Sequence, residues 1–217
     1  MLEFLFSFPF IILEIIVVIV LILIGISFYL GCCYNMKINS YVLDESIYVY
    51  HEFQSNVKNI PINSKKVYKE LGQKCIEALD KKICKFMFIC FDDPNNLKDC
   101  NKLRYCAGLL FPNKDLKDYQ LQELSKSRFS TAFLPKSSTI RTSFPYKCFL
   151  SFNIGSDKAW PLLIKNAAMK KEMTNIQQKD YIYIEFWNND SIEYILLTEN
   201  LNKFDLTTNP KPKMKNE

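Results

Sequence analysis

The sequence predicts an α+β domain made of two β-α-β-β units, attached to an N-terminal helix that spans a membrane. An uncharged apolar run near the N-terminus is long enough to cross a bilayer. The rest of the chain alternates short β-prone runs with helical segments, in the order strand, helix, strand, strand, followed by the same order again. Each unit alone would leave one sheet face bare, so the two units must pack together.

The apolar N-terminal segment, residues 1–33, is predicted to be a membrane anchor. Residues 15–30 carry no charge, and the apolar character extends upstream to Phe10, with Glu14 as the one interruption. A spanning helix needs about 20 apolar residues. A cleaved signal peptide is the main alternative, but it would have a basic start and a small-residue cleavage site, and this segment has neither. We therefore expect a single-pass anchor.

The residues that flank this segment indicate its orientation. Lys37 lies just after the helix and no basic residue precedes it, which places the C-terminal domain in the cytosol. A sugar on Asn189, in the only glycosylation sequon, would contradict that orientation. Cys32 and Cys33 abut the helix end, as palmitoylated cysteines do, and are lipidation candidates. Unmodified thiols at the membrane border are the alternative.

The net charge of the chain and the distribution of its basic residues bear differently on a nucleic-acid function. Glu3 and Glu14 are the only charged side chains before Lys37, so the net charge of +5 becomes +7 for the part after the apolar run. Such an excess favours anionic lipid or nucleic acid. However, no basic stripe with interleaved aromatic residues is present. We expect a solvated basic surface and no nucleic-acid contact.

The first half of the domain is predicted to begin after a polar linker that covers residues 34–45. A strand covers 47–53, and a helix begins with Ser64 as its N-cap, followed by Val67, Leu71, Cys75 and Leu79 at a four-residue spacing. Two strands follow at 83–91 and 103–111, separated by a polar turn at 92–96.

The second half repeats this order within a domain that covers residues 46–200. After a short helical or irregular stretch at 116–124, strands are expected at 129–134 and 139–144 around Pro135. A helix is expected at 157–173, with Pro161 in its first turn. A hairpin of 181–187 and 192–198 follows. The remainder, residues 201–217, is predicted to be a disordered tail.

Few residues carry recognisable chemistry. The single histidine, His51, lies in a strand-like run and is expected to be structural, and no catalytic triad can be built around it. Nothing resembles a phosphate-binding loop or a dinucleotide fingerprint, so no cofactor is expected. Most of the eight cysteines are expected to be reduced. Their five-residue spacings lack the tight knuckle of a zinc site, so no metal is expected.

One constellation points to ligand binding. Strand alternation places Tyr181, Tyr183, Glu185 and Trp187 on one face of the sheet. A carboxylate among aromatic rings suits a cationic or polar-aromatic ligand. It also suits a general base with a raised pKa. A solvated glutamate on an edge strand is the alternative reading.

Four stretches of the sequence are together typical of one family: Phe88–Pro94, Arg104–Gly108, Thr142–Tyr146 and Ile184–Phe186. Through them the chain resembles the family of testis-expressed protein 264, whose members carry a cytosolic gyrase-inhibitor-like (GyrI-like) domain anchored in the endoplasmic reticulum. The resemblance implies a duplicated β-α-β-β fold with a ligand groove between the halves. Tyr146, Trp160, Tyr183, Glu185 and Trp187 are the candidate groove residues, with Glu185 at the position that contacts cationic ligands in related domains.

The same resemblance implies a receptor or adaptor in selective autophagy of the endoplasmic reticulum. Its partners would be autophagy or AAA-ATPase machinery. The family's interaction motif lies in a long disordered tail, whereas this tail has only 17 residues. Phe204–Thr207 fails the motif at its last position, and Tyr194–Leu197 fits by letters but lies in a predicted core strand.

We therefore expect a non-enzymatic binding protein, with no catalytic residues. Two alternatives remain open. In the first, the domain is a hydrolytic enzyme in which Glu185 and Tyr146 position a water for attack on an electrophilic or cationic compound. In the second, it is a structural membrane protein whose groove is closed.

Overall fold

The computed structural model describes residues 2–74, 84–92, 103–112, 129–171, 181–188, 190–204 and 206. Its helices are α1 (Leu2–Tyr29), η1 (a 3-10 helix, Val57–Asn59), α2 (Ile60–Lys74), α5 (Phe149–Lys171) and α6 (Leu201–Phe204). Its strands are β1 (Asn39–Leu43), β2 (Ser46–Ser55), β3 (Lys85–Cys90), β4 (Leu103–Pro112), β5 (Ser130–Leu134), β6 (Ser137–Pro145), β7 (Ile182–Trp187) and β8 (Ser191–Leu197).

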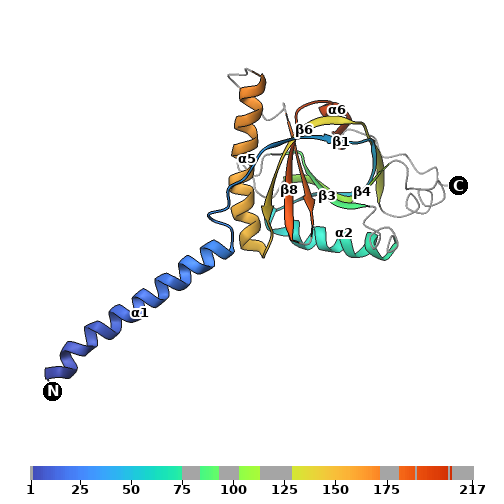
Figure 1. Ribbon diagram of the computed structural model, residues 1–217. Helices are drawn as coiled ribbons and strands as arrows, with labels where there is room; N and C mark the ends of the chain where they lie inside the picture. Colours follow the sequence, from blue (N-terminus) through green and yellow to red (C-terminus); the bar gives the residue numbers. More distant parts are fainter. Residues whose placement is uncertain are drawn as a thin grey trace.

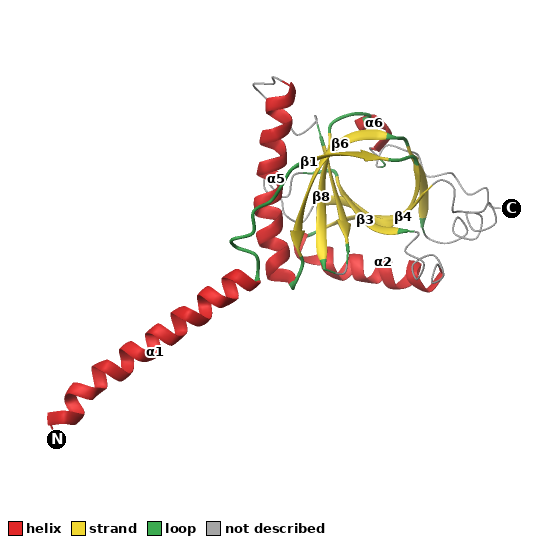
Figure 2. Ribbon diagram, viewed as in Figure 1, coloured by secondary structure: helices red, strands yellow, loops and turns green. Residues whose placement is uncertain are grey.

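The eight strands form one antiparallel sheet in the order β1-β6-β8-β7-β3-β4-β2-β5. The sheet curls on itself, and α2 and α5 lie on the outside of the curl (Figure 1, Figure 2). Alternate residues of the strands fill two separate cores. One core lies beneath α2 and α5 and includes Tyr183, whereas the other includes Ile184 and is closed by Phe204 of α6.

The predicted duplication is present, and the strand register defines it. β2-α2-β3-β4 and β6-α5-β7-β8 occupy the two halves of the sheet, which meet at the antiparallel pair of β3 and β7. The two remaining strands are exchanged between the halves: β1, which precedes the first half in sequence, pairs with β6 of the second, and β5, which precedes the second half, pairs with β2 of the first. The turns that follow β1 and β5 have the same hydrogen bond: the hydroxyls of Ser46 and Ser137 each donate to the backbone carbonyl two residues earlier.

This symmetry places two chemically different residues at the centre of the sheet. Phe88 and Glu185 are Cα partners at the middle of the β3 and β7 pair. Phe88 in the N-terminal half is therefore the structural equivalent of Glu185 in the C-terminal half. The two halves therefore share a backbone arrangement but only the C-terminal half carries a carboxylate at this position. A sequence comparison of the halves cannot reveal such a repeat, because the equivalent residues have diverged.

Several element boundaries differ from the sequence-based predictions. β1 lies inside the predicted linker, and α6 lies inside the predicted disordered tail, where Phe204 and Leu206 are buried. Helix α2 begins at Ile60, so Ser64 is a buried residue within the helix and the prediction of an N-cap there is wrong. The predictions for Cys75, Leu79, Asn189, the turn after Asp92, the stretch at 116–124, the helix end at Met173 and the tail beyond Leu206 lie outside the described residues.

Helix α5 begins at Phe149, eight residues before the predicted start at Asp157, so Pro161 is inside the helix. The start is fixed by Ser151, whose hydroxyl oxygen accepts from the backbone N–H of Cys148 at 3.0 Å. This bond satisfies a donor that the helix leaves without an intrahelical partner. Pro161 was expected in the first turn, where a proline costs nothing, but it lies in the interior of the helix. It is tolerated there because packing on β6 and β8 holds the helix in place.

The N-terminal helix α1 extends away from the domain (Figure 1). Phe10–Tyr29 is long and apolar enough to cross a membrane, with a mean hydropathy of 3.2 and no part of it buried. The chain just after α1 is held against the domain, because Leu30 is 7% exposed and the rings of Tyr34 and Phe144 meet in a T-shaped contact with centroids 5.6 Å apart. Gly31 has a φ of 84° and lies so close to Phe144 that a Cβ would clash with that ring.

Candidate functional site: an aromatic cavity around a buried glutamate

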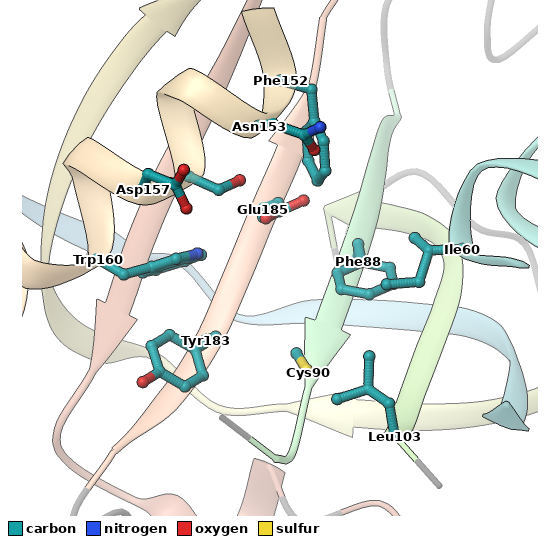
Figure 3. A pocket seen from close by; sticks show the side chains of 11 residues that line it. Ile60, Phe88, Cys90, Leu103, Phe152, Asn153, Asp157, Trp160, Tyr183 and Glu185 are labelled. Carbon is teal, nitrogen blue, oxygen red and sulfur yellow. The ribbon is translucent and has the colours of Figure 1, made fainter. Parts of the chain in front are cut away.

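A cavity of about 280 Å³ lies between α2 and α5, over the central strands β3 and β7. Its lining comes from five elements, which meet here because the two halves of the sheet join at this point (Figure 3). The lining residues are Ile60, Phe88, Cys90, Leu103, Phe152, Asn153, Ser156, Asp157, Trp160, Tyr183 and Glu185. The predicted groove between the halves therefore exists, and the alternative of a closed groove is wrong.

Glu185 supplies the buried charge of this cavity. The residue is 4% exposed, and its carboxylate accepts a hydrogen bond of 2.8 Å from the indole N–H of Trp187. Burial disfavours the ionised form and raises the pKa of Glu185 to about 7, while the bond from Trp187 acts in the opposite direction. Near neutral pH this group therefore exchanges between the carboxylic acid and the carboxylate.

Aromatic rings form much of the wall around this carboxyl group. Trp160 and Tyr183 meet edge to face, with ring centroids 4.6 Å apart, and Phe88 lies opposite them (Figure 3). Trp160 also packs against Tyr194, the Cα partner of Glu185 on β8. Rings fixed in this way present their faces and edges to a ligand without further loss of side-chain freedom. The wall is suited to a flat or cationic guest.

The charge of the lining favours a cation. Glu185 lies deep in the cavity, whereas Asp157 and Asn153 are exposed at its rim on α5. Among the described lining residues two are acidic and none is basic. A positive group that enters would meet the rim carboxylate of Asp157 first and the buried carboxylate of Glu185 last.

The sequence-based candidates divide into two groups. Trp160, Tyr183 and Glu185 line the cavity, and Trp187 contacts it through its hydrogen bond to Glu185. Tyr146 is not among the described lining residues; its ring lies 6.2 Å from that of Trp187. The alternation of β7 is as expected, since Ile182, Ile184 and Phe186 face the other core.

Residues from α5 were missed in the sequence. Phe152, Asn153, Ser156 and Asp157 share one face of this helix with Trp160, at the spacing of successive helical turns. They were overlooked because the helix was expected to begin at Asp157. Recognition of Ser151 as a first-turn capping residue would have revealed them.

Two further sets of candidates have defined positions. Cys32 and Cys33 are exposed at the end of α1. The motif-like segment Tyr194–Leu197 is fully buried in β8 between β6 and β7, and Phe204 is buried as well. Tyr194–Leu197 therefore lacks the free extended backbone that an added-strand interaction requires, and Phe204 is the last residue of α6.

No protein-family model matches the sequence, and no curated protein matches it. Among solved structures, the chain is similar to SAV2435 bound to tetraphenylphosphonium, at 8% identity over 76% of this chain and 96% of that one, with a TM-score of 0.41. An integron cassette protein of Vibrio cholerae is 10% identical over 75% and 98% of the two chains, with a TM-score of 0.39. A hydrolase from Listeria innocua is 6% identical over 74% and 90%, with a TM-score of 0.48. At similarities this low, the α+β assignment rests on the strand order and duplication of the chain itself.

Proposed function

We propose that this chain is a membrane-anchored binding protein whose cavity holds a small lipophilic cation against Glu185. The observation that carries the proposal is a buried carboxylate in an aromatic cavity whose described lining contains no basic side chain. Burial of an unpaired carboxylate is costly, and an opposite charge in the same cavity offsets that cost. A ligand cation therefore supplies the positive charge that the described lining residues do not place beside Glu185.

The aromatic wall adds selectivity for shape and charge. A quaternary ammonium near the faces of Trp160 and Tyr183 is attracted by their ring quadrupoles, and its alkyl or aryl groups fill the apolar space beside Phe88. Such a cation has no N–H group and needs no hydrogen-bond acceptor, so its attraction to the carboxylate is purely electrostatic. A neutral ligand of the same shape gains only the apolar contacts.

The apolar helix and the resemblance support a proposal for the cellular location of the domain. We propose that α1 crosses the membrane of the endoplasmic reticulum once and leaves the domain in the cytosol, as the position of Lys37 indicates. A role as a receptor or adaptor in selective autophagy is supported by the resemblance alone. With Tyr194–Leu197 buried, that role needs a surface other than the motif-like segments.

The proposal is tested by titration of the full chain in detergent micelles with phenyltrimethylammonium and with tert-butylbenzene, which has the same shape and no charge. The two tryptophans of the chain, Trp160 and Trp187, both lie at the site, so fluorescence excited selectively at tryptophan reports on the site. We expect saturable binding of the cation and weaker binding of the neutral compound.

Glu185→Gln is the matched variant, because it keeps the size and removes the charge. It should weaken binding of phenyltrimethylammonium by roughly tenfold or more and leave the affinity for tert-butylbenzene unchanged. Equal loss for both ligands, or no loss for either, would overturn the assignment of Glu185 as the cation partner.

Hydrolysis of a small electrophile is the second candidate function, and it is favoured by one observation. A carboxylate with a pKa of about 7 is matched to general-base catalysis at neutral pH. The expected partner Tyr146 is not among the described lining residues, so Glu185 would have to orient the water with the help of Ser156 or Asn153. Turnover of a panel of esters, epoxides and lactones that is lost in Glu185→Gln would establish this function; binding without turnover would exclude it for that panel.

A further inference from the structure

A row of aromatic rings leads from the cavity to the surface of the domain. Phe152 lines the cavity, and its ring lies 5.5 Å from that of Trp187, the hydrogen-bond partner of Glu185. Phe152 also stacks on Phe149, with ring centroids 6.0 Å apart. The row thus connects the buried carboxylate to the first turn of α5.

The outer end of this row is an exposed apolar pair. Phe149 is 53% exposed and Leu150 is 55% exposed, although both are large apolar side chains. Neither is needed to cap the helix, because Ser151 provides that bond. An apolar pair that continues a ligand cavity onto the surface is a natural extension of the binding site.

The helix that carries this pair lies beside the point where the anchor joins the domain. The ammonium of Lys158 on α5 donates to the backbone carbonyls of Gly31 and Tyr34 at 3.5 Å and also to that of Cys32. Figure 1 shows that α1 ends beside the N-terminal half of α5, which contains this pair. If α1 crosses a bilayer, the first turn of α5, which begins at Phe149, is therefore close to the membrane surface.

We propose that the ligand of this site is an amphiphilic ammonium compound taken from the bilayer. Its charged head lies at Glu185, and its alkyl chain runs over Phe152 to Phe149 and Leu150. This inference rests on the proposed function, to which it adds the ligand class and the route of entry. A bilayer concentrates compounds of this kind at its surface, and the row of rings offers the chain continuous apolar contact on the way to the cavity.

The test uses the full chain reconstituted into phosphatidylcholine vesicles. Butyltrimethylammonium and dodecyltrimethylammonium are compared, with the fluorescence of Trp160 and Trp187 as the readout. The longer chain should bind roughly tenfold or more tightly, because each methylene group taken out of water strengthens binding by up to about fourfold. In Phe149→Ser/Leu150→Ser most of this advantage of the long chain should be lost, while binding of butyltrimethylammonium is unchanged.

A matched control removes two apolar side chains of similar exposure elsewhere. Val42 on β1 and Phe133 on β5 are 45% and 54% exposed and do not line the cavity. Val42→Ser/Phe133→Ser should keep the wild-type ratio of the two affinities, which corrects for partition of the long chain into lipid.

The outcomes separate this inference from the proposed function. If the ratio of the affinities for dodecyltrimethylammonium and butyltrimethylammonium is the same in the wild type and in Phe149→Ser/Leu150→Ser, with butyltrimethylammonium still bound through Glu185, the proposal of an amphiphilic ligand is overturned. That result would leave the proposed cation site standing. Failure of the wild type to bind either compound would overturn both.

Discussion

At the scale of single residues, the site depends on where one carboxylate is placed. Glu185 lies in the centre of the sheet, and its Cα partners are Phe88 and Tyr194. Strand alternation was enough to predict Tyr183 and Trp187 as neighbours of Glu185 on the same strand, because residues two apart on a strand share a face. The depth of its burial could not be predicted, because α5 covers it from a distant part of the sequence.

Burial of Glu185 should make the stability of the domain depend on pH. Its pKa is raised from 4.5 to about 7 in the folded protein, so the folded state binds more protons than the unfolded state between these values. Stability is therefore highest below the unfolded pKa and falls as pH rises to about 7, by on the order of 3 kcal/mol. Glu185→Gln should lose this slope in urea unfolding measured from pH 4.5 to 8. A wild-type stability that is flat or rises relative to the variant would contradict the raised pKa.

Trp187 should set the pH range in which the site binds a cation. Its indole N–H donates to the Glu185 carboxylate and opposes the rise of the pKa. Trp187→Phe removes this donor and keeps an aromatic ring, so the pKa of Glu185 should rise further. The affinity for phenyltrimethylammonium, measured by calorimetry between pH 5 and 9, should then reach its plateau at a higher pH than in the wild type. An unchanged midpoint would mean that the bond has no effect on ionisation.

At the scale of elements, the strands could largely be predicted from the sequence and the ends of the helices could not. The hairpin of β7 and β8 was expected within a residue or two, because its alternation is regular and its turn is polar. β1 was missed, because it is short and its pairing partner β6 lies almost a hundred residues away. The start of α5 was misplaced because Pro161 resembled a first-turn proline.

The position of α5 depends on a close approach at Gly155. A Cβ at this residue would lie 2.7 Å from the Tyr194 hydroxyl and 2.8 Å from a ring carbon of Phe144. Gly155→Ala should therefore destabilise the domain by about 1–3 kcal/mol, even though alanine is the better helix former. Thermal unfolding followed by circular dichroism measures this loss. Gly25→Ala is the matched control, because no atom lies within 4 Å of a Cβ there; equal melting temperatures for the two variants would contradict the packing.

At the scale of the whole molecule, duplication creates the site, and the orientation of the site is set by the proposed anchor. The cavity forms where the two halves meet, and the exchanged strands β1 and β5 tie each half to the other. The order of the elements was enough to predict the duplication. The exchange was not predictable, because it depends on pairing between distant strands.

The anchor is tested by extraction of cell membranes with alkaline carbonate. The full chain should stay in the membrane pellet, since Phe10–Tyr29 fills the hydrocarbon thickness. Ile19→Lys/Ile22→Lys should shift the chain to the soluble fraction, because each lysine near the bilayer centre costs about 3 kcal/mol. Release of the unmodified chain by carbonate would contradict a spanning helix.

The most direct test of the central claim, that Glu185 receives a cation in an aromatic cavity, is a nuclear magnetic resonance titration. Because the chain has two tryptophans, a ¹⁵N-labelled sample in micelles gives two indole N–H resonances, and that of Trp187 comes from the group bonded to Glu185. Addition of phenyltrimethylammonium should shift both resonances in a saturable way in the wild type and only weakly in Glu185→Gln. If both resonances remain unchanged in the wild type up to millimolar cation, the cavity does not bind cations and the account is wrong.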